Sequence, residues 1–158
     1  MDKLNVICVD DQREVLSAVL QDLEPLAEWL NIEDCESADE VLALMDELDS
    51  EGEYIALLIS DHVMPGKTGV ELLTEVSQDR RFTHTKKILL TGQATHGDTI
   101  QAINSAGINQ YFEKPWQVEQ LLESVTRLVT EYIFDSGLDY TDYHSYLDQQ
   151  VVLDNLRV

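Results

Sequence analysis

The chain has few basic residues, few cysteines and no long apolar segment, and each shortage excludes a class of protein. Its 158 residues include only 10 lysines and arginines against 31 aspartates and glutamates, a net charge of −21. Such a surface repels phosphate backbones, which argues against direct binding of nucleic acid. No apolar run is long enough to cross a bilayer, and the N-terminus lacks a signal-peptide layout. We therefore expect a cytoplasmic protein without a membrane partner, whose acidity serves solubility or docking to a basic patch on another protein.

The two cysteines have none of the neighbours that a metal or redox site needs. Cys8 lies within an apolar run and Cys35 at the end of another, without a CxxC partner or a nearby histidine. We predict two buried, reduced thiols.

Short apolar runs alternate with stretches of helical spacing along the chain. The expected strands are residues 4–9, 32–36, 55–60, 87–90 and 108–112, and the expected helices are residues 13–23, a segment opened by Ser37, a segment opened by Gly69, about 98–106 and 117–134. This alternation predicts an α/β fold, a doubly wound five-stranded parallel sheet with five flanking helices. We place one domain at residues 1–134 and a C-terminal extension, partly helical, at residues 135–158.

Polar residues follow four of the expected strands at the points where these strands end. They are Asp10 and Asp11, Asp61, Thr91 and Lys114. Because the carboxyl ends of parallel strands share one edge of the sheet, these residues should meet in a single pocket there. Taken singly, each has an ordinary explanation as a turn or cap residue; their order and placement together favour one site.

The contents of this pocket indicate phosphoryl transfer to a carboxylate. Three carboxylates brought together repel unless a cation joins them, and hard oxygen ligands suit Mg²⁺, with Mn²⁺ as the other choice. A lysine opposite the metal would hold a phosphate oxygen, and the threonine hydroxyl would hold another. A carboxylate nucleophile, a metal and a cation are the groups that such a transfer requires.

Four sequence motifs resemble the receiver domain of two-component response regulators. They are VDDQ at residues 9–12, LLISDHVMPGKTGVELL at 57–73, LLTGQA at 89–94 and YFEKPW at 111–116, and the resemblance covers residues 4–133. It implies a flavodoxin-like sheet of strand order 2-1-3-4-5.

The resemblance also implies a role for each motif residue. Asp61 matches the phosphoacceptor, and Asp10, Asp11, Asp61 and the backbone carbonyl of Val63 match the Mg²⁺ ligands. Thr91 and Tyr111 match the switch residues, Lys114 matches the phosphate-binding lysine, and the Lys114–Pro115 bond is expected to be cis.

The implied function is that of a phosphoacceptor which hydrolyses its own acyl phosphate, rather than an enzyme. Its donor would be a sensor histidine kinase or a histidine phosphotransfer protein, and a homodimer is possible. Two alternatives stay open. The chain is the regulatory N-terminal part of a longer regulator with an enzymatic output domain, or it is a metal-dependent phosphatase. Val63 argues against a phosphatase of the haloacid type, in which a second acid stands two residues after the nucleophile.

Two side chains near the expected pocket and the C-terminal extension each have more than one interpretation. His62 either tunes hydrolysis of the acyl phosphate or is an exposed loop residue. Trp116 either packs on the first turn of the following helix or contacts a partner. In the extension, Tyr140, Tyr143, Leu147 and Val151 recur with helical spacing, which predicts an amphipathic helix from near residue 141. This segment packs on its own domain, docks to another chain, or links to a further domain.

Overall fold

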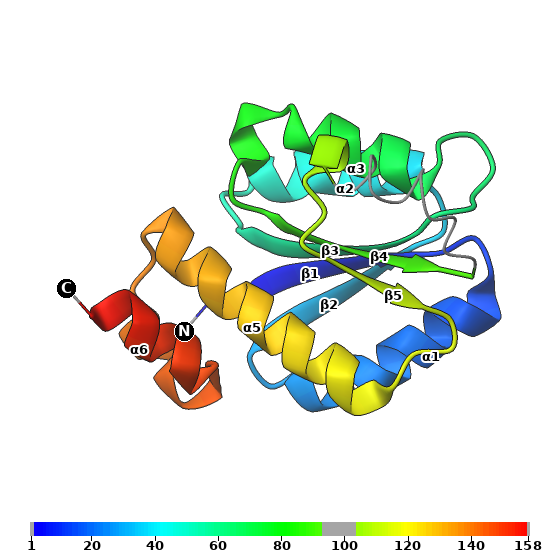
Figure 1. The fold of residues 1–158 in the computed structure, drawn as a ribbon. Coiled ribbons are helices and arrows are strands. Elements are labelled where there is room, and N and C mark those ends of the chain that lie inside the picture. The colour runs from blue at the N-terminus through cyan, green and yellow to red at the C-terminus, as the bar shows by residue number, and fades with distance from the viewer. Residues whose placement is uncertain (1, 93–103, 158) are drawn as a thin grey trace.

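A computed structural model describes residues 2–92 and 104–157, and it contains a single sheet of five parallel strands (Figure 1). The strands are β1 (Leu4–Val9), β2 (Leu30–Cys35), β3 (Ile55–Asp61), β4 (Lys86–Thr91) and β5 (Gln110–Glu113). Their order is β2-β1-β3-β4-β5. The predicted fold class and strand order are therefore confirmed.

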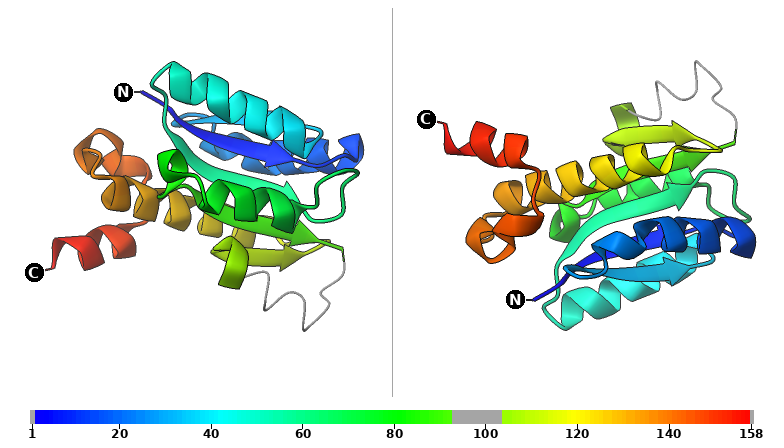
Figure 2. Two further views of the ribbon diagram at one scale, coloured as in Figure 1. Left: turned by 90° about the horizontal axis from the view of Figure 1, so that it is seen from above. Right: turned by 90° about the horizontal axis from the view of Figure 1, so that it is seen from below.

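Helices cover both faces of this sheet (Figures 1 and 2). Helices α1 (Arg13–Leu23) and α5 (Val118–Ser136) lie on one face, and α2 (Ala38–Ser50) and α3 (Gly69–Ser77) lie on the other. Short 3₁₀ helices, η1 (Glu24–Leu26) and η2 (Arg80–Phe82), follow α1 and α3. The helix expected at residues 98–106 falls mostly outside the described residues, of which 104–106 are helical.

The core consists of two apolar layers separated by the sheet. Every residue of β1 and β3 is buried, as expected of central strands with helices on both sides. Cys8 faces the layer under α1 and α5, whereas Cys35 faces the layer under α2 and α3. Both thiols are free and buried, as predicted.

The C-terminal extension differs from the single helix that its spacing predicts. Residues Tyr140–Tyr146 form a 3₁₀ helix, η3, and Gln149–Leu156 form an α-helix, α6. Leu147 between them is extended, with φ −79° and ψ 159°. The carboxylate of Asp148 accepts hydrogen bonds from the main-chain N–H groups of residues 150 and 151, so it begins a new helix at that point.

The extension packs on its own domain, at the end of the sheet where the strands begin. The Tyr146 ring stacks on Trp29 at 5.6 Å between centroids and an interplanar angle of 6°. The Tyr143 hydroxyl donates to the carbonyl of Asp2 at 2.6 Å. Tyr143 and Leu147 are buried against the layer under α1 and α5. Of the three arrangements considered for this segment, packing on its own domain is therefore the one present. Within the described ranges, no helix combines the length and apolarity that a membrane crossing requires.

Candidate functional site

The structure brings the polar residues at the strand ends together at one edge of the sheet. Asp10 directly follows β1, Asp61 ends β3, Thr91 ends β4, and Lys114 directly follows β5. A pocket of about 560 Å³ opens there, lined by Asp11, Gln12, Asp61, His62, Val63, Thr91, Gly92 and Lys114. Asp10, only 3% exposed, is buried at the same place and is joined to the pocket through Lys114.

Lys114 joins two buried carboxylates. Its Nζ lies 2.8 Å from Oδ1 of Asp61 and 3.1 Å from Oδ2 of Asp10. Its main-chain N–H donates to the carbonyl of Thr91 at 2.9 Å, and the Lys114–Pro115 peptide bond is cis, the isomer that the resemblance implied. The lysine is thus held through both its backbone and its side chain.

The pKa values of Asp61 and Lys114 are shifted both by burial and by the charge of the other group. Burial raises the pKa of Asp61, and the hydrogen bond and charge of Lys114 oppose that rise only in part. For Lys114, burial acts to lower the pKa, but the carboxylates of Asp61 and Asp10 outweigh it and the pKa is raised. Lys114 therefore keeps its positive charge, whereas further positive charge near Asp61 would stabilise the ionised form of its carboxylate.

The carboxylates fit a divalent cation. Asp10, Asp11 and Asp61 each present an oxygen, and these oxygens lie within 4.8 Å of one another. One oxygen of Asp10 is oriented by the main-chain N–H of Gln12 at 2.8 Å. Hard oxygen donors at this spacing, one of them exposed to solvent, suit Mg²⁺ with water completing its coordination.

The other predicted site residues lie around the same pocket. Val63 lines the pocket and is 75% exposed, while Thr91 is buried. Tyr111 is half-buried in β5, next to Leu89 of β4, and packs on the layer under α2 and α3. Thr91 stands two residues beyond Leu89 and thus faces the same side of the sheet as Tyr111.

Gly69 is a residue of the site that the sequence interpretation missed. A Cβ atom at this position would collide with the main-chain carbonyl of Asp61. Its N–H donates to the carbonyl of His62 at 2.8 Å, which ties the start of α3 to the loop after β3. Thr68 and Glu71 form a capping box at the same point. The signal in the sequence was a glycine beside a helix-capping threonine.

His62 and Trp116 differ from their simplest interpretations. His62 is half-buried, and its Nδ1 is shielded from solvent without a hydrogen-bond partner among the described residues. The Trp116 indole donates to Oδ2 of Asp22 in α1 at 2.7 Å and packs on the layer under α1 and α5. The loop after β5 is therefore fixed to a helix that precedes it by 94 positions.

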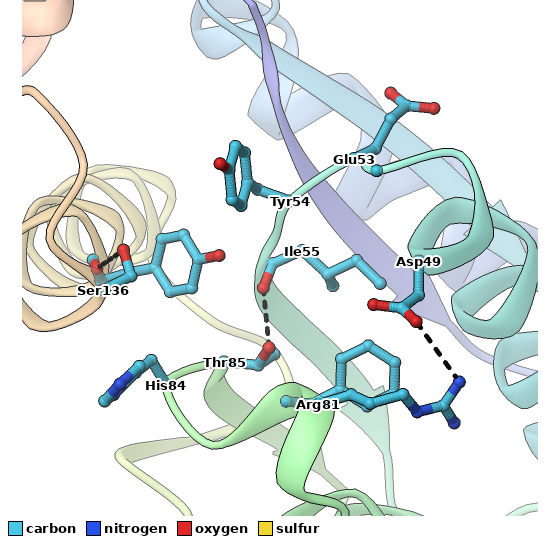
Figure 3. Close-up of a pocket in the computed structure, with 11 residues that line it drawn as sticks. Asp49, Glu53, Tyr54, Ile55, Arg81, His84, Thr85 and Ser136 are labelled. Carbon is cyan, nitrogen blue, oxygen red and sulfur yellow. Dashed lines mark hydrogen bonds and ion pairs between the residues drawn. The ribbon is translucent and has the colours of Figure 1, made fainter.

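A second cavity, of about 310 Å³, lies at the opposite end of the sheet (Figure 3). It borders Ile55, the first residue of β3, and Thr85, which directly precedes β4, and the Thr85 hydroxyl donates to the Ile55 carbonyl at 2.7 Å. The Arg81 guanidinium there is paired with Asp46 and Asp79, each at 2.8 Å. This guanidinium is therefore already paired with carboxylates, and the predicted site residues, Asp10, Asp11, Asp61, Thr91 and Lys114, lie at the other edge of the sheet.

Comparison with known protein families identifies the family of this chain. The model of the response regulator receiver domain matches residues 6–126. The chain belongs to this family. As a receiver, it has the acidic pocket and the lysine at the edge of the sheet where the motifs predicted them.

Relatives include both short and long regulators. The chain is 33% identical over 124 residues to the hydrogenase transcriptional regulatory protein HoxA of Cupriavidus necator, a match covering 78% of this chain and 24% of HoxA. It thus spans about a quarter of that relative's length. The chemotaxis protein CheY of Pseudomonas aeruginosa is 27% identical over 128 residues, with 79% of this chain and 95% of CheY covered.

Solved structures of receiver domains have a similar fold. The signal receiver domain of an HD domain-containing protein from Pseudomonas fluorescens superposes with a TM-score of 0.75 at 26% identity, covering 87% of this chain and 94% of its own. A CheY-like receiver from Methanospirillum hungatei gives a TM-score of 0.70 at 28% identity, covering 85% and 99%.

Proposed function

We propose that this receiver accepts a phosphoryl group on Asp61 from a phosphohistidine donor, in a reaction that depends on Mg²⁺. The observation that supports this most directly is the Lys114 ammonium between Asp61 and Asp10, beside the carboxylate of Asp11. A nucleophilic carboxylate, a cation and a metal-binding set of oxygens are then present in one pocket.

In the proposed reaction, a carboxylate oxygen of Asp61 attacks phosphorus, and the bond from phosphorus to the donor imidazole breaks. Lys114 holds a phosphoryl oxygen and offsets its charge. Asp10, Asp11, Asp61 and the carbonyl of Val63 are the oxygens proposed to hold Mg²⁺, which when bound neutralises charge on the transferred group. Hydrolysis of the acyl phosphate by water returns the receiver to its first state without a separate enzyme.

Phosphorylation adds a group of about −1.5 to −2 charge to a buried position. We infer that the Thr91 hydroxyl moves toward this group and that Tyr111 turns into the space that it leaves. Both residues lie on the side of the sheet that α2 and α3 cover. The movement would change the surface near β5 that a partner contacts, as a shift between two packings.

The proposed donor is a sensor histidine kinase or a histidine phosphotransfer protein, acting in the cytoplasm, with a protein as the downstream target. A second candidate is that the chain regulates an output domain in a longer protein, favoured by its coverage of only 24% of HoxA. Sequencing the reading frame through and beyond the codon for residue 158 distinguishes the two.

Intact-mass analysis tests the phosphoacceptor function. The wild-type protein, incubated with acetyl phosphate and Mg²⁺, should gain the mass of one phosphoryl group, and EDTA should prevent this gain. Asp61→Asn should gain nothing. A wild-type protein that stays unmodified, or an Asp61→Asn variant modified to the same extent, would overturn the proposal.

The readout of the switch and the oligomeric state need separate measurements. Thr91→Ala should still be phosphorylated while losing most of the phosphorylation-dependent change in partner binding. A full change in that variant contradicts the coupling through Thr91. Size-exclusion chromatography with and without acetyl phosphate shows whether the phosphorylated form is a homodimer.

A further inference from the structure

The loop that carries Lys114 is held from three directions. The Lys114 side chain contacts Asp10 and Asp61, and its main-chain N–H bonds to β4 through the Thr91 carbonyl at 2.9 Å. The third contact comes from α1, where Oδ2 of Asp22 accepts the Trp116 indole N–H at 2.7 Å. Only this third contact lies outside the phosphorylation pocket.

The Asp22 carboxylate is placed where it does not favour its own helix. It is the penultimate residue of α1, and the last turn of that helix contains no basic residue. A negative charge there is unfavourable with respect to the helix dipole. Among residues 2–92 and 104–157 it has no ion pair, so the indole is its hydrogen-bond partner. The contribution of Asp22 is therefore a contact with the loop.

That contact is transmitted to Lys114 through a short and restricted segment. A single residue, Pro115, separates Trp116 from Lys114, and its ring fixes the backbone angle φ. Trp116 itself packs on the layer under α1 and α5. If the indole loses its acceptor, the segment keeps only two of its three contacts, and any resulting shift of the Lys114 backbone displaces the ammonium from Asp61. Reaction rates respond steeply to such misplacement.

We propose that Asp22 is a positioning residue for phosphorylation, which acts by holding Trp116 and hence the loop from which Lys114 reaches Asp61. This inference rests on the proposed phosphoacceptor function. It extends the working site to the far end of α1, to a residue that touches neither the metal ligands nor the phosphoryl group.

The test measures the rate of phosphorylation by acetyl phosphate as a function of Mg²⁺ concentration. Asp22→Ala should fold, since alanine favours helix and the unfavourable charge is removed. We expect the rate at saturating Mg²⁺ to fall about fivefold, with an unchanged half-saturating Mg²⁺ concentration because the carboxylate ligands are intact. General damage to the fold would change both quantities.

Matched variants separate positioning from other effects. Asp22→Asn keeps a carbonyl acceptor for the indole and should retain a rate within about twofold of wild type. Trp116→Phe keeps the ring and removes the donor, so it should match Asp22→Ala, and the double variant should be no slower than either. Gln21→Ala, an exposed neighbour on α1, should have no effect.

Two outcomes overturn the inference in distinguishable ways. If wild type reacts and Asp22→Ala reacts equally fast, or if Asp22→Asn is as slow as Asp22→Ala, the positioning role is wrong while the phosphoacceptor function stands. If wild type itself gains no phosphoryl group, the proposed function fails and the positioning role fails with it.

Discussion

Replacing Lys114 with methionine would test how far one ammonium stabilises the acidic pocket. Lys114→Met keeps a long side chain and removes the positive charge. Asp10 and Asp61, whose side chains are 4% and 8% exposed, would then face one another without their cation. The folded protein, but not the unfolded chain, would carry this repulsion. We therefore expect a lower free energy of unfolding.

The size of the effect follows from the burial of the three groups. Removing one partner from a fully buried ion pair costs about 3–5 kcal/mol. The Lys114 side chain is 19% exposed and borders an open pocket, so water screens part of the repulsion. We expect a loss of about 2–3 kcal/mol at pH 7 without divalent ions. For a chain of this length, that lowers the melting temperature by roughly 4–12 °C.

The pH and the metal should each reverse the loss. The pKa of Asp61 is raised by burial, and Lys114 acts to lower it, so the variant raises that pKa further. Because the folded state then binds a proton more tightly than the unfolded chain, stability is regained as the pH falls from 7 through this raised pKa. Mg²⁺ supplies the missing positive charge, and since the Lys114 ammonium no longer competes with it for the carboxylates, it should bind the variant more tightly than the wild type and so reduce the deficit.

Urea unfolding followed by far-UV circular dichroism measures these differences, in EDTA and in Mg²⁺, at pH 7 and pH 5. Lys86→Met is the matched control: Lys86 lies 2.6 Å from Asp135, whose side chain is 46% exposed. Loss of that pair should cost about 1 kcal/mol or less, with no dependence on Mg²⁺. A Lys114→Met protein as stable as wild type in EDTA, or a deficit that neither acid nor Mg²⁺ reduces, would refute the reasoning.

Three further substitutions test other contacts. Gly69→Ala should lose about 3 kcal/mol in urea unfolding because its methyl group meets main-chain atoms, whereas Gly92→Ala, with open space around it, should lose less than about 1 kcal/mol. Asp61→Asn should melt at a higher temperature than wild type at pH 7 in EDTA, and the gap should close toward pH 4; an equal melting temperature at pH 7 contradicts the raised pKa of Asp61. Tyr143→Phe should lose about 1 kcal/mol, since its hydroxyl donates a hydrogen bond of 2.6 Å to a main-chain carbonyl; Tyr140→Phe, whose hydroxyl makes no such bond within the described residues, is its control.

The sheet and its polar edge could be predicted from the sequence because both depend on local patterns. Strand β3 is a continuous apolar run that ends at an aspartate, and a parallel sheet brings such strand ends together whatever lies between them. The extension was harder to predict. Helical spacing marked Tyr143 and Leu147 as buried, which they are, but spacing alone does not separate a 3₁₀ helix from an α-helix. The helix start at Asp148 depended on its side-chain cap.

Contacts between distant segments could not be predicted in this way. The hydrogen bond from Trp116 to Asp22 joins positions 94 residues apart. It depends on how α1 lies against the loop after β5, and no periodicity in either segment specifies that. The collision that excludes a side chain at Gly69 likewise depends on how closely α3 approaches the end of β3.

The separation of the two thiols by the sheet makes the folded protein a convenient subject for labelling. Burial raises the pKa of Cys35 to about 12 and raises that of Cys8 as well, so neither is a nucleophile at neutral pH. A cysteine introduced at an exposed position would react alone with a maleimide dye, leaving the native pair silent. Unfolding would uncover both native thiols, and their reaction with a chromogenic disulfide would then count the opened molecules.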